Sequence, residues 1–262
     1  MNPREQLIYL ALMYKGDRRK IIDHITRRLG ISHNAKLPKM PFKALTFFDE
    51  DYPEEFKQYG LAPLVLFYYG DISLIFKSEN NIAVVGTRKP TEYGIKKTEE
   101  IVKELAKDYV IVSGLASGID AIAHKSAIEV RGKTVAVLGC GIDRCYPSEN
   151  QELYEEIKKN HLVISEYPYM DFSSYDSFPF RNRLIAMFSK GVFISQASYR
   201  SGTSITASFA LEFSKDVMCL PYPADEMSLC NRLIGQGAFL VENAKDIDSI
   251  MNGLENGPIF EN

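Results

Sequence analysis

Glycine, serine and arginine recur where short apolar segments of this sequence end. Gly86-Thr87-Arg88-Lys89 follows one apolar run, Ser113-Gly114-Leu115-Ala116-Ser117-Gly118 follows the next, and Arg200-Ser201-Gly202-Thr203 comes later. Glycine lets backbone N–H groups approach an anion closely, and a helix that begins just afterwards adds the positive end of its dipole. Arginine adds mobile positive charge. These residues favour a phosphate-binding site, although small residues also serve ordinary turns.

A second group of hydrogen-bond donors stands at the start of an amphipathic segment. Its sequence is Phe178-Pro179-Phe180-Arg181-Asn182-Arg183-Leu184-Ile185-Ala186. Guanidinium groups bind phosphate in bidentate fashion, and either phenylalanine offers a base a stacking face. The alternative is a structural helix start whose arginines pair with Glu166 or Asp176. We expect this segment to contribute to the same phosphate-binding site.

The familiar nucleotide-binding motifs are not matched. Ser113–Gly118 is not a G-x-G-x-x-G fingerprint. Gly132-Lys133-Thr134 resembles the end of a P-loop, but Ala127 stands at the position of its first glycine. This triplet also opens a strand, whereas the P-loop triplet opens a helix. The sequence therefore predicts no NAD or ATP site and no cofactor.

Candidate catalytic groups are equally few. Asp120 and His124 are four residues apart on one predicted helix, where they form either a base with its orienting group or a structural pair. The sequence has no H-E-x-x-H motif, and the spacing of its four cysteines does not fit a zinc knuckle or ribbon. We expect neither a catalytic residue nor a metal site.

The elements that position these loops are short apolar strands alternating with helices. The expected strands are 44–48, 64–68, 82–85, 110–112, 134–138, 162–164, 192–194, 217–220 and 239–241, and helical periodicity covers 95–107, 119–131 and 203–215. Continuously apolar strands that alternate with helices predict an α/β fold with a parallel sheet covered on both faces. In such a sheet, ligands bind beyond the carboxyl ends of the strands. The phosphate-binding candidates all fall there.

The first 40 residues differ from the rest of the chain in charge. Nine lysines and arginines face three acidic residues there, although the whole chain has a net charge of −3. The segments 3–15 and 17–29 read as two helices, and Ile21, Ile22, Ile25 and Leu29 mark an apolar face of the second. We expect a helical region over 1–40, a main domain over 41–252 and a tail over 253–262. The basic helices serve either nucleic-acid contact or simple solvation.

Length and composition exclude several classes of protein. The chain has 262 residues, of which 45% are hydrophobic and 25% charged, so collagen, coiled-coil and disordered classes do not fit. No apolar run reaches the length of a membrane span, and the N-terminus lacks an apolar signal core. We expect a cytoplasmic protein without membrane contact.

Taken in order, the motifs resemble one family. The resemblance is carried by Gly86-Thr87-Arg88, Ser113–His124, Gly139–Pro147, Ser165–Pro168, Phe178–Arg183 and Ser201–Ala207, preceded by Asp51-Tyr52-Pro53 and Ala62–Gly70. The chain resembles the DNA-processing protein A family (DprA, also called Smf) over residues 45–242. The order and length of these matches make chance similarity improbable.

The resemblance implies an extended Rossmann-like, doubly wound, mostly parallel sheet that binds single-stranded DNA in a basic pocket without catalysis. It also implies a homodimer that protects incoming single strands and loads the RecA recombinase onto them during natural transformation. Matching motifs place the following residues in the pocket: Arg88, Ser113, Gly114, Arg181, Asn182, Arg183, Ser201 and Gly202. Gly118, which closes the second loop, completes the predicted site.

The sequence departs from the family pattern at a few positions. Gln196 stands where an acidic residue is usual, Pro221-Tyr222 replaces a Pro-Gly, and Thr203-Ser204 replaces Ser-Leu. Many members carry a C-terminal winged helix, which we expect to be absent because few residues follow Met251.

A second function remains open as an alternative. Related Rossmann-like enzymes hydrolyse nucleoside monophosphates with a glycine-rich loop followed by a glutamate. Residues 199–203 and Glu212 are the nearest counterparts here, without the double glycine.

Overall fold

The computed structural model describes residues 1–32, 34–169, 177–199 and 201–253. Its strands are β1 (Lys43–Thr46), β2 (Val65–Gly70), β3 (Asn81–Val85), β4 (Val110–Ser113), β5 (Thr134–Val137), β6 (Leu162–Ser165), β7 (Gly191–Ile194), β8 (Asp216–Cys219) and β9 (Phe239–Leu240). Its helices are α1 (Pro3–Met13), α2 (Arg18–Thr26), α3 (Glu54–Lys57), α4 (Glu92–Leu105), α5 (Ile119–Glu129), α6 (Gln151–Asn160), α7 (Ser177–Met187), α8 (Thr203–Glu212), α9 (Leu229–Gly235) and α10 (Ala244–Met251). Strands and helices alternate from β3 onward, as expected.

All the strands form one nine-stranded sheet in the order β1-β2-β6-β5-β4-β3-β7-β8-β9. The pairings from β6 to β9 are parallel, whereas β2 pairs antiparallel with both β1 and β6. The parallel part is doubly wound, because the chain moves from β3 toward β6 on one side and from β7 toward β9 on the other. This confirms the predicted extended, mostly parallel α/β sheet.

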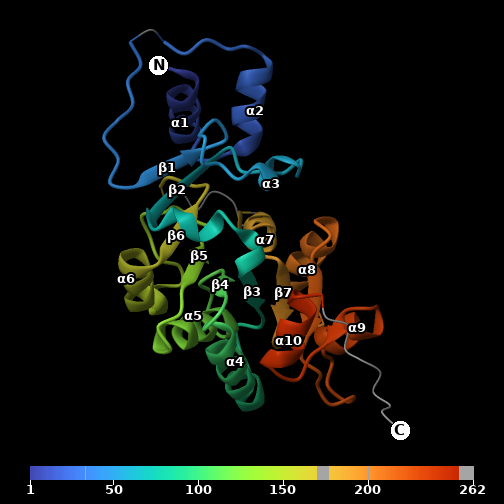
Figure 1. Cartoon of the computed structure of the whole chain (residues 1–262). Coiled ribbons are helices and arrows are strands. Elements are labelled where there is room, and N and C mark those ends of the chain that lie inside the picture. The colour runs from blue at the N-terminus through green and yellow to red at the C-terminus, as the bar shows by residue number, and fades with distance from the viewer. Residues whose placement is uncertain (33, 170–176, 200, 254–262) are drawn as a thin grey trace.

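The direction of winding decides which helices lie together. Right-handed crossovers in opposite directions place helices on both faces of the sheet. Accordingly α4 packs against α5, and α7 packs against α8. The central strands are buried on both faces, and every residue of β3, β5, β6 and β7 is buried. In Figure 1, α8, α9 and α10 lie together on the right-hand side, below α1 and α2 at the top.

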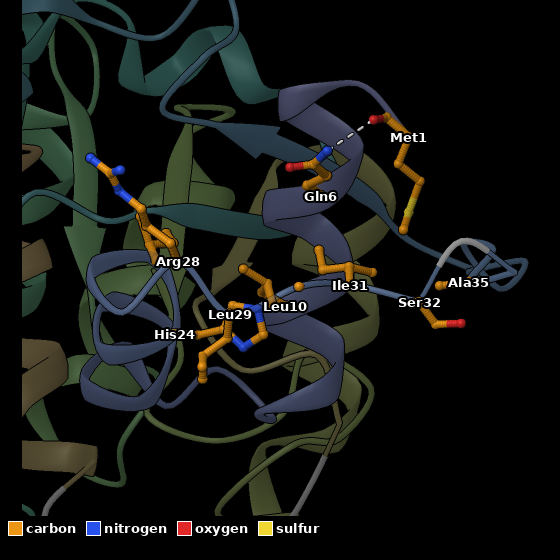
Figure 2. Close-up of a pocket in the computed structure, with 11 residues that line it drawn as sticks. Met1, Gln6, Leu10, His24, Arg28, Leu29, Ile31, Ser32 and Ala35 are labelled. Atoms are coloured by element: carbon orange, nitrogen blue, oxygen red, sulfur yellow. Dashed lines mark hydrogen bonds between the residues drawn. The ribbon is translucent and has the colours of Figure 1, made fainter.

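The N-terminal helices pack against the antiparallel edge of the sheet. Leu7, Leu10 and Ala11 of α1 belong to the same buried cluster as Phe67 of β2. The apolar face predicted for the second helix is divided: Ile21 of α2 is buried, Ile22 and Ile25 are exposed, and Leu29, also exposed, lies beyond the end of α2. Figure 2 shows the cavity of about 530 Å³ that α1, α2 and the residues after them line. It lies in the N-terminal region, whereas the predicted phosphate-binding loops belong to the main sheet.

Helix starts agree with local capping chemistry. The side chain of Asn2 accepts a hydrogen bond from the backbone of Glu5 and so caps α1. Thr91 caps α4 by accepting from the N–H of Gly94, so this helix begins before the apolar periodicity that predicted it. None of the helices in the described part of the chain is long and apolar enough to cross a bilayer.

A neutral histidine is enclosed between α5 and β5. His124 is fully buried, and its Nδ1 lies 2.6 Å from the hydroxyl of Thr134. That hydroxyl donates to the carbonyl of Ile111, so His124 donates to the hydroxyl. Within the described ranges, the buried Nε2 of His124 has no hydrogen-bond partner. Burial, together with the positive potential of His161 and Arg181, lowers the pKa of His124 to about 3.

This histidine predicts a loss of stability in mild acid. The unfolded chain protonates His124 near pH 6.5 and the folded chain only near 3, so protons favour unfolding between these values. We expect the free energy of unfolding to fall by about 1.4 kcal/mol per pH unit below pH ~6.5 from this residue alone. Urea unfolding at several pH values should show a smaller pH dependence in His124→Gln. Equal slopes in the two proteins would contradict this assignment.

Candidate nucleic-acid interface

The doubly wound sheet reverses its direction between β3 and β7. Neighbouring loops diverge at such a switch point and leave a crevice beyond the carboxyl ends of the strands. The two loops are tied at their base, because the backbone N–H of Thr87 donates to the carbonyl of Gln196 at 2.6 Å. The predicted phosphate-binding loops therefore meet at the place where this fold class binds ligands.

Gly118 holds the loop that carries Arg88. Its φ is +76°, and a Cβ built on it would lie 2.4 Å from the carbonyl oxygen of Thr87 and 2.7 Å from the carbonyl carbon of Arg88. The next residue, Ile119, donates its backbone N–H to that carbonyl oxygen of Thr87 at 3.1 Å. This packing fixes the backbone of Arg88, while the side chains of Arg88 and Lys89 are exposed.

Replacement of Gly118 by alanine should therefore disturb both stability and the site. We expect a loss of about 1–3 kcal/mol in unfolding free energy from the backbone conformation alone, with displacement of the Arg88 loop in addition. Gly202→Ala is the matched control, because Gly202 has φ −59° and a Cβ added to it would meet, beyond its two chain neighbours, no atom of the described residues within 4 Å. Urea unfolding compares the two variants. A Gly118→Ala protein as stable as Gly202→Ala would contradict this role.

Arg181 lies beneath the crevice rather than on its surface. Its side chain is 6% exposed, and Nη1 donates to the carbonyls of Gly114, at 2.8 Å, and Val137. Burial lowers the pKa of Arg181, while the nearby carboxylate of Asp120 opposes this shift. Arg181 thus joins the loop after β4 to the end of β5 and contributes positive potential from below.

Asp120 and His124 do not form the predicted pair. The carboxylate of Asp120 accepts from the backbone N–H groups of Gly114 and Ala116, at 3.2 and 3.4 Å. Burial raises the pKa of Asp120, and the positive charge of Arg181 opposes that rise. Asp120 therefore shapes the loop after β4, whereas His124 bonds to Thr134. Neither residue is placed as a base with an orienting partner.

The start of α8 closes the other side of the site. No side chain caps this helix at Gly202, and its first turn contains no acidic residue. The hydroxyl of Ser201 is buried and has no hydrogen-bond partner among the residues that the structure describes. Asn182 Nδ2 donates to the carbonyl of Gly202 at 3.3 Å, which connects α7 to this turn. An uncapped helix start with a free hydroxyl is suited to an anion.

Arg183 differs from the prediction. Its guanidinium is fully buried and forms an ion pair with Glu166 at 2.6 Å. It also donates to the carbonyls of Leu61 and Phe180. Successive helical residues are rotated by about 100°, so Arg181 and Arg183 point in nearly opposite directions. Arg183 therefore forms the structural ion pair with Glu166 that was the alternative to phosphate binding. Asp176, the other acidic partner considered for these arginines, lies outside the described residues.

The predicted residues divide into a surface group and a supporting group. Arg88, Gly118, Asn182, Ser201 and Gly202 are exposed or partly exposed, and contacts join Gly118 to Arg88 and Asn182 to Gly202. Ser113, Gly114, Arg181 and Arg183 are buried. Ser113 donates its hydroxyl to the carbonyl of Val84 at 2.6 Å and so joins β4 to β3. Arg200 lies outside the described residues.

Sequence reasoning missed the role of Gln196. Its Oε1 accepts from the backbone N–H of Thr91 at 2.9 Å, and its Nε2 donates to the hydroxyl of the same residue at 3.1 Å. Gly94 permits this, because a Cβ there would lie 2.2 Å from Oε1 of Gln196. The amide thus sets the start of α4 against the loop after β7. The sequence offered two signals: a polar residue in a strand-end turn, and the replacement by Gln196 of the acidic residue that is usual there in the family.

Aromatic rings border the site beside β5. Phe178 packs against Gly139, where a Cβ would lie 2.6 Å from its ring. The ring of Tyr146 lies 5.3 Å from that of Phe178, and Tyr146 is 40% exposed. Exposed rings next to a positive site suit unpaired bases.

The groups required by the enzymatic alternative are not together. Glu212 is the last residue of α8, whereas Ser201 and Gly202 precede its first residue. A ten-residue helix is about 15 Å long, so the carboxylate of Glu212 does not reach a group held at the helix start. Within the described ranges, no three His, Cys, Asp or Glu side chains gather as a metal site requires.

The fold defines a class: a doubly wound, extended Rossmann-like protein whose strand-end loops meet at the switch point of its sheet. The family model for DNA recombination-mediator protein A matches residues 43–252. The chain belongs to this family.

Individual relatives agree. A Smf protein from Synechocystis is 41% identical over 80% of this chain and 53% of its own length. DprA from Streptococcus pneumoniae is 39% identical over 79% of this chain and 73% of its own. This chain therefore spans about half of the first relative and about three quarters of the second.

Two solved structures share the fold. DprA from Streptococcus pneumoniae superimposes with a TM-score of 0.75 at 33% identity, covering 94% of this chain and 92% of that one. DprA from Helicobacter pylori, studied for its single-stranded DNA binding mode, gives a TM-score of 0.72 at 33% identity, covering 82% and 96%.

Proposed function

We propose that this protein binds single-stranded DNA along the carboxyl edge of its sheet, with the phosphates at Arg88 and at the start of α8. One observation carries the proposal. The exposed Arg88 and the uncapped start of α8 belong to loops that meet at the switch point, and the buried hydroxyl of Ser201 beside that start has no hydrogen-bond partner among the described residues. Positive charge and free donors suit phosphate there.

The choice of a single strand rests on the rings beside this positive site. Tyr146 and Phe178 present aromatic surface at the edge of the sheet. A base can stack on such a ring only when it is unpaired, and stacking is tolerant of sequence. The DNA-binding study of the Helicobacter pylori relative supports the same choice.

Affinity measured by fluorescence anisotropy tests the proposal. An oligothymidylate and a duplex of mixed sequence are titrated at two salt concentrations. We expect tighter binding of the single strand, with affinity that falls steeply as salt rises. Equal affinity for the duplex, or affinity independent of salt, would contradict the proposed interface.

We further propose a cytoplasmic homodimer that protects incoming strands and loads RecA during natural transformation. Membership of the DNA recombination-mediator protein A family supports this. Analytical ultracentrifugation tests the dimer. A strand-exchange assay with RecA tests the loading, and RecA filaments that form no faster with the protein than without it would contradict it.

The proposed role is binding and not catalysis. A nucleoside monophosphate hydrolase would need an acid close to the bound nucleotide, and Glu212 lies at the far end of α8. Base release from a nucleotide by the purified protein, abolished in Glu212→Gln, would contradict the binding role.

A further inference from the structure

An exposed aromatic ring and an arginine are stacked beside the proposed DNA site. The guanidinium carbon of Arg232, in α9, lies 4.6 Å from the ring centre of Tyr199, in the loop after β7. Tyr199 is 41% exposed. In the described part of the chain, the guanidinium of Arg232 has no acidic partner. Tyr199 keeps exposed ring surface beside this cation, so the pair can offer an aromatic face to a base and a positive charge to a phosphate.

The backbone around this pair is fixed. The N–H of Tyr199 donates to the carbonyl of Met227 at 3.2 Å, and Ser198 forms an isolated antiparallel bridge with Ser228. Leu229 donates its N–H to the carbonyl of Ala197 at 2.8 Å. The loop after β7 is therefore attached to the segment that enters α9, and the ring is carried on a defined support.

We propose that Tyr199 and Arg232 form a second base-stacking platform for single-stranded DNA, in which a base lies on the tyrosine ring and the arginine meets a neighbouring phosphate. The inference rests on the proposed function and extends its site toward β8. Aromatic rings recognise bases through their faces, and guanidinium groups both stack on rings and bind phosphate.

The position of the platform suits a strand that crosses the whole site. Tyr146 and Phe178 lie beside the end of β5, and Tyr199 lies beside the loops after β7 and β8. The strand order puts four inter-strand steps between β5 and β8, about 19 Å at about 4.8 Å per step. Arg88 follows β3, which lies between them. A DNA strand would thus meet rings at both ends of a positive centre.

The length of the DNA gives a specific test. Anisotropy titrations use oligothymidylates of about 4 and about 16 nucleotides, the range of site sizes of single-strand binding folds. We expect Tyr199→Ala to weaken binding of the longer strand about five-fold or more, with little effect on the shorter one. Tyr199→Phe should restore affinity because it keeps the ring, and Arg232→Gln should weaken binding of the longer strand and reduce its salt dependence.

Phe48→Ala is the matched control, because Phe48 is 59% exposed and follows β1 at the opposite edge of the sheet. A second measurement locates the DNA on the protein. Photocrosslinking with 5-iododeoxyuridine in the longer strand should label Tyr199. If Tyr199→Ala binds the longer strand with unchanged affinity and Tyr199 forms no crosslink, the platform is overturned. The proposed function still stands in that case if Arg88→Glu weakens or abolishes binding. A wild-type protein that binds no single strand would overturn the proposed function and the platform together. A Tyr199→Ala protein that changes its oligomeric state instead would overturn the platform and assign this surface to a second copy of the chain.

Discussion

Arg88→Glu is expected to lower the affinity for single-stranded DNA about ten-fold or more. Arg88 is exposed at the switch point, and its backbone is held by Gly118 and Thr87, so its charge is presented from a fixed support. The substitution removes a positive charge that would meet a phosphate and puts a repelling charge in the same place. Anisotropy titrations over a range of salt should also show a less negative slope of log affinity against log salt, by about 0.7 for each phosphate that the variant no longer neutralises.

Arg131→Glu is the matched control for this experiment. Arg131 is also an exposed arginine, but it follows α5 and precedes β5, so it lies at the amino edge of the sheet. Both variants change the net charge equally, so a general electrostatic effect would weaken DNA binding to a similar degree in each. Equal decreases in affinity would contradict a focused site at Arg88. Urea unfolding should leave both proteins close to wild type, because neither guanidinium is buried.

The expected result explains how a chain of net charge −3 can bind nucleic acid. Acidic residues on outer helix surfaces form ion pairs with nearby lysines, as Glu104 does with Lys107 and Glu129 with Lys103. Exposed pairs of this kind are screened and act weakly at a distance. The charge of Arg88, supported from below by Arg181, is concentrated where a strand would lie. The total charge therefore says little about the local potential.

The order of the elements was predictable because its signal is local. Apolar runs such as 82–85 and 192–194 became buried central strands, and glycine-rich turns followed them. Because all parallel strands end at one edge, the sequence also predicted that these turns share that edge. The antiparallel pairing of β2 with β6 was not predictable from periodicity, since it joins segments that are distant in the chain.

The individual side chains of the site were harder to predict. Arg181 and Arg183 are both arginines at a helix start, and only their angular separation distinguishes the one below the crevice from the one in the core. Tyr199 and Arg232 were not paired in advance, because their contact depends on how the loops after β7 and β8 join. Helical phase was available in the sequence, whereas loop pairing requires the tertiary structure.

Breaking the buried pair of Arg183 and Glu166 is expected to destabilise the fold by about 3–5 kcal/mol, because it leaves one charge buried without its partner. The two single variants should differ. Arg18 of α2 also senses this pair: burial lowers the pKa of Arg18, the charge of Arg183 lowers it further, and that of Glu166 opposes the shift. In Arg183→Met the carboxylate of Glu166 keeps Arg18 as a neighbour, whereas Glu166→Gln removes the carboxylate that the described residues place between the charges of Arg18 and Arg183.

Urea unfolding at neutral pH should therefore show a larger decrease in unfolding free energy for Glu166→Gln than for Arg183→Met. The double variant should cost less than the sum of the single ones, since it removes both buried charges. In urea-free buffer, where it is still folded, Arg183→Met should bind single-stranded DNA as the wild type does. An Arg183→Met protein of wild-type stability that binds DNA poorly would instead place Arg183 in the DNA site. The two measurements separate a residue that holds the crevice from one that lines it, although both stand in the same Arg-Asn-Arg sequence.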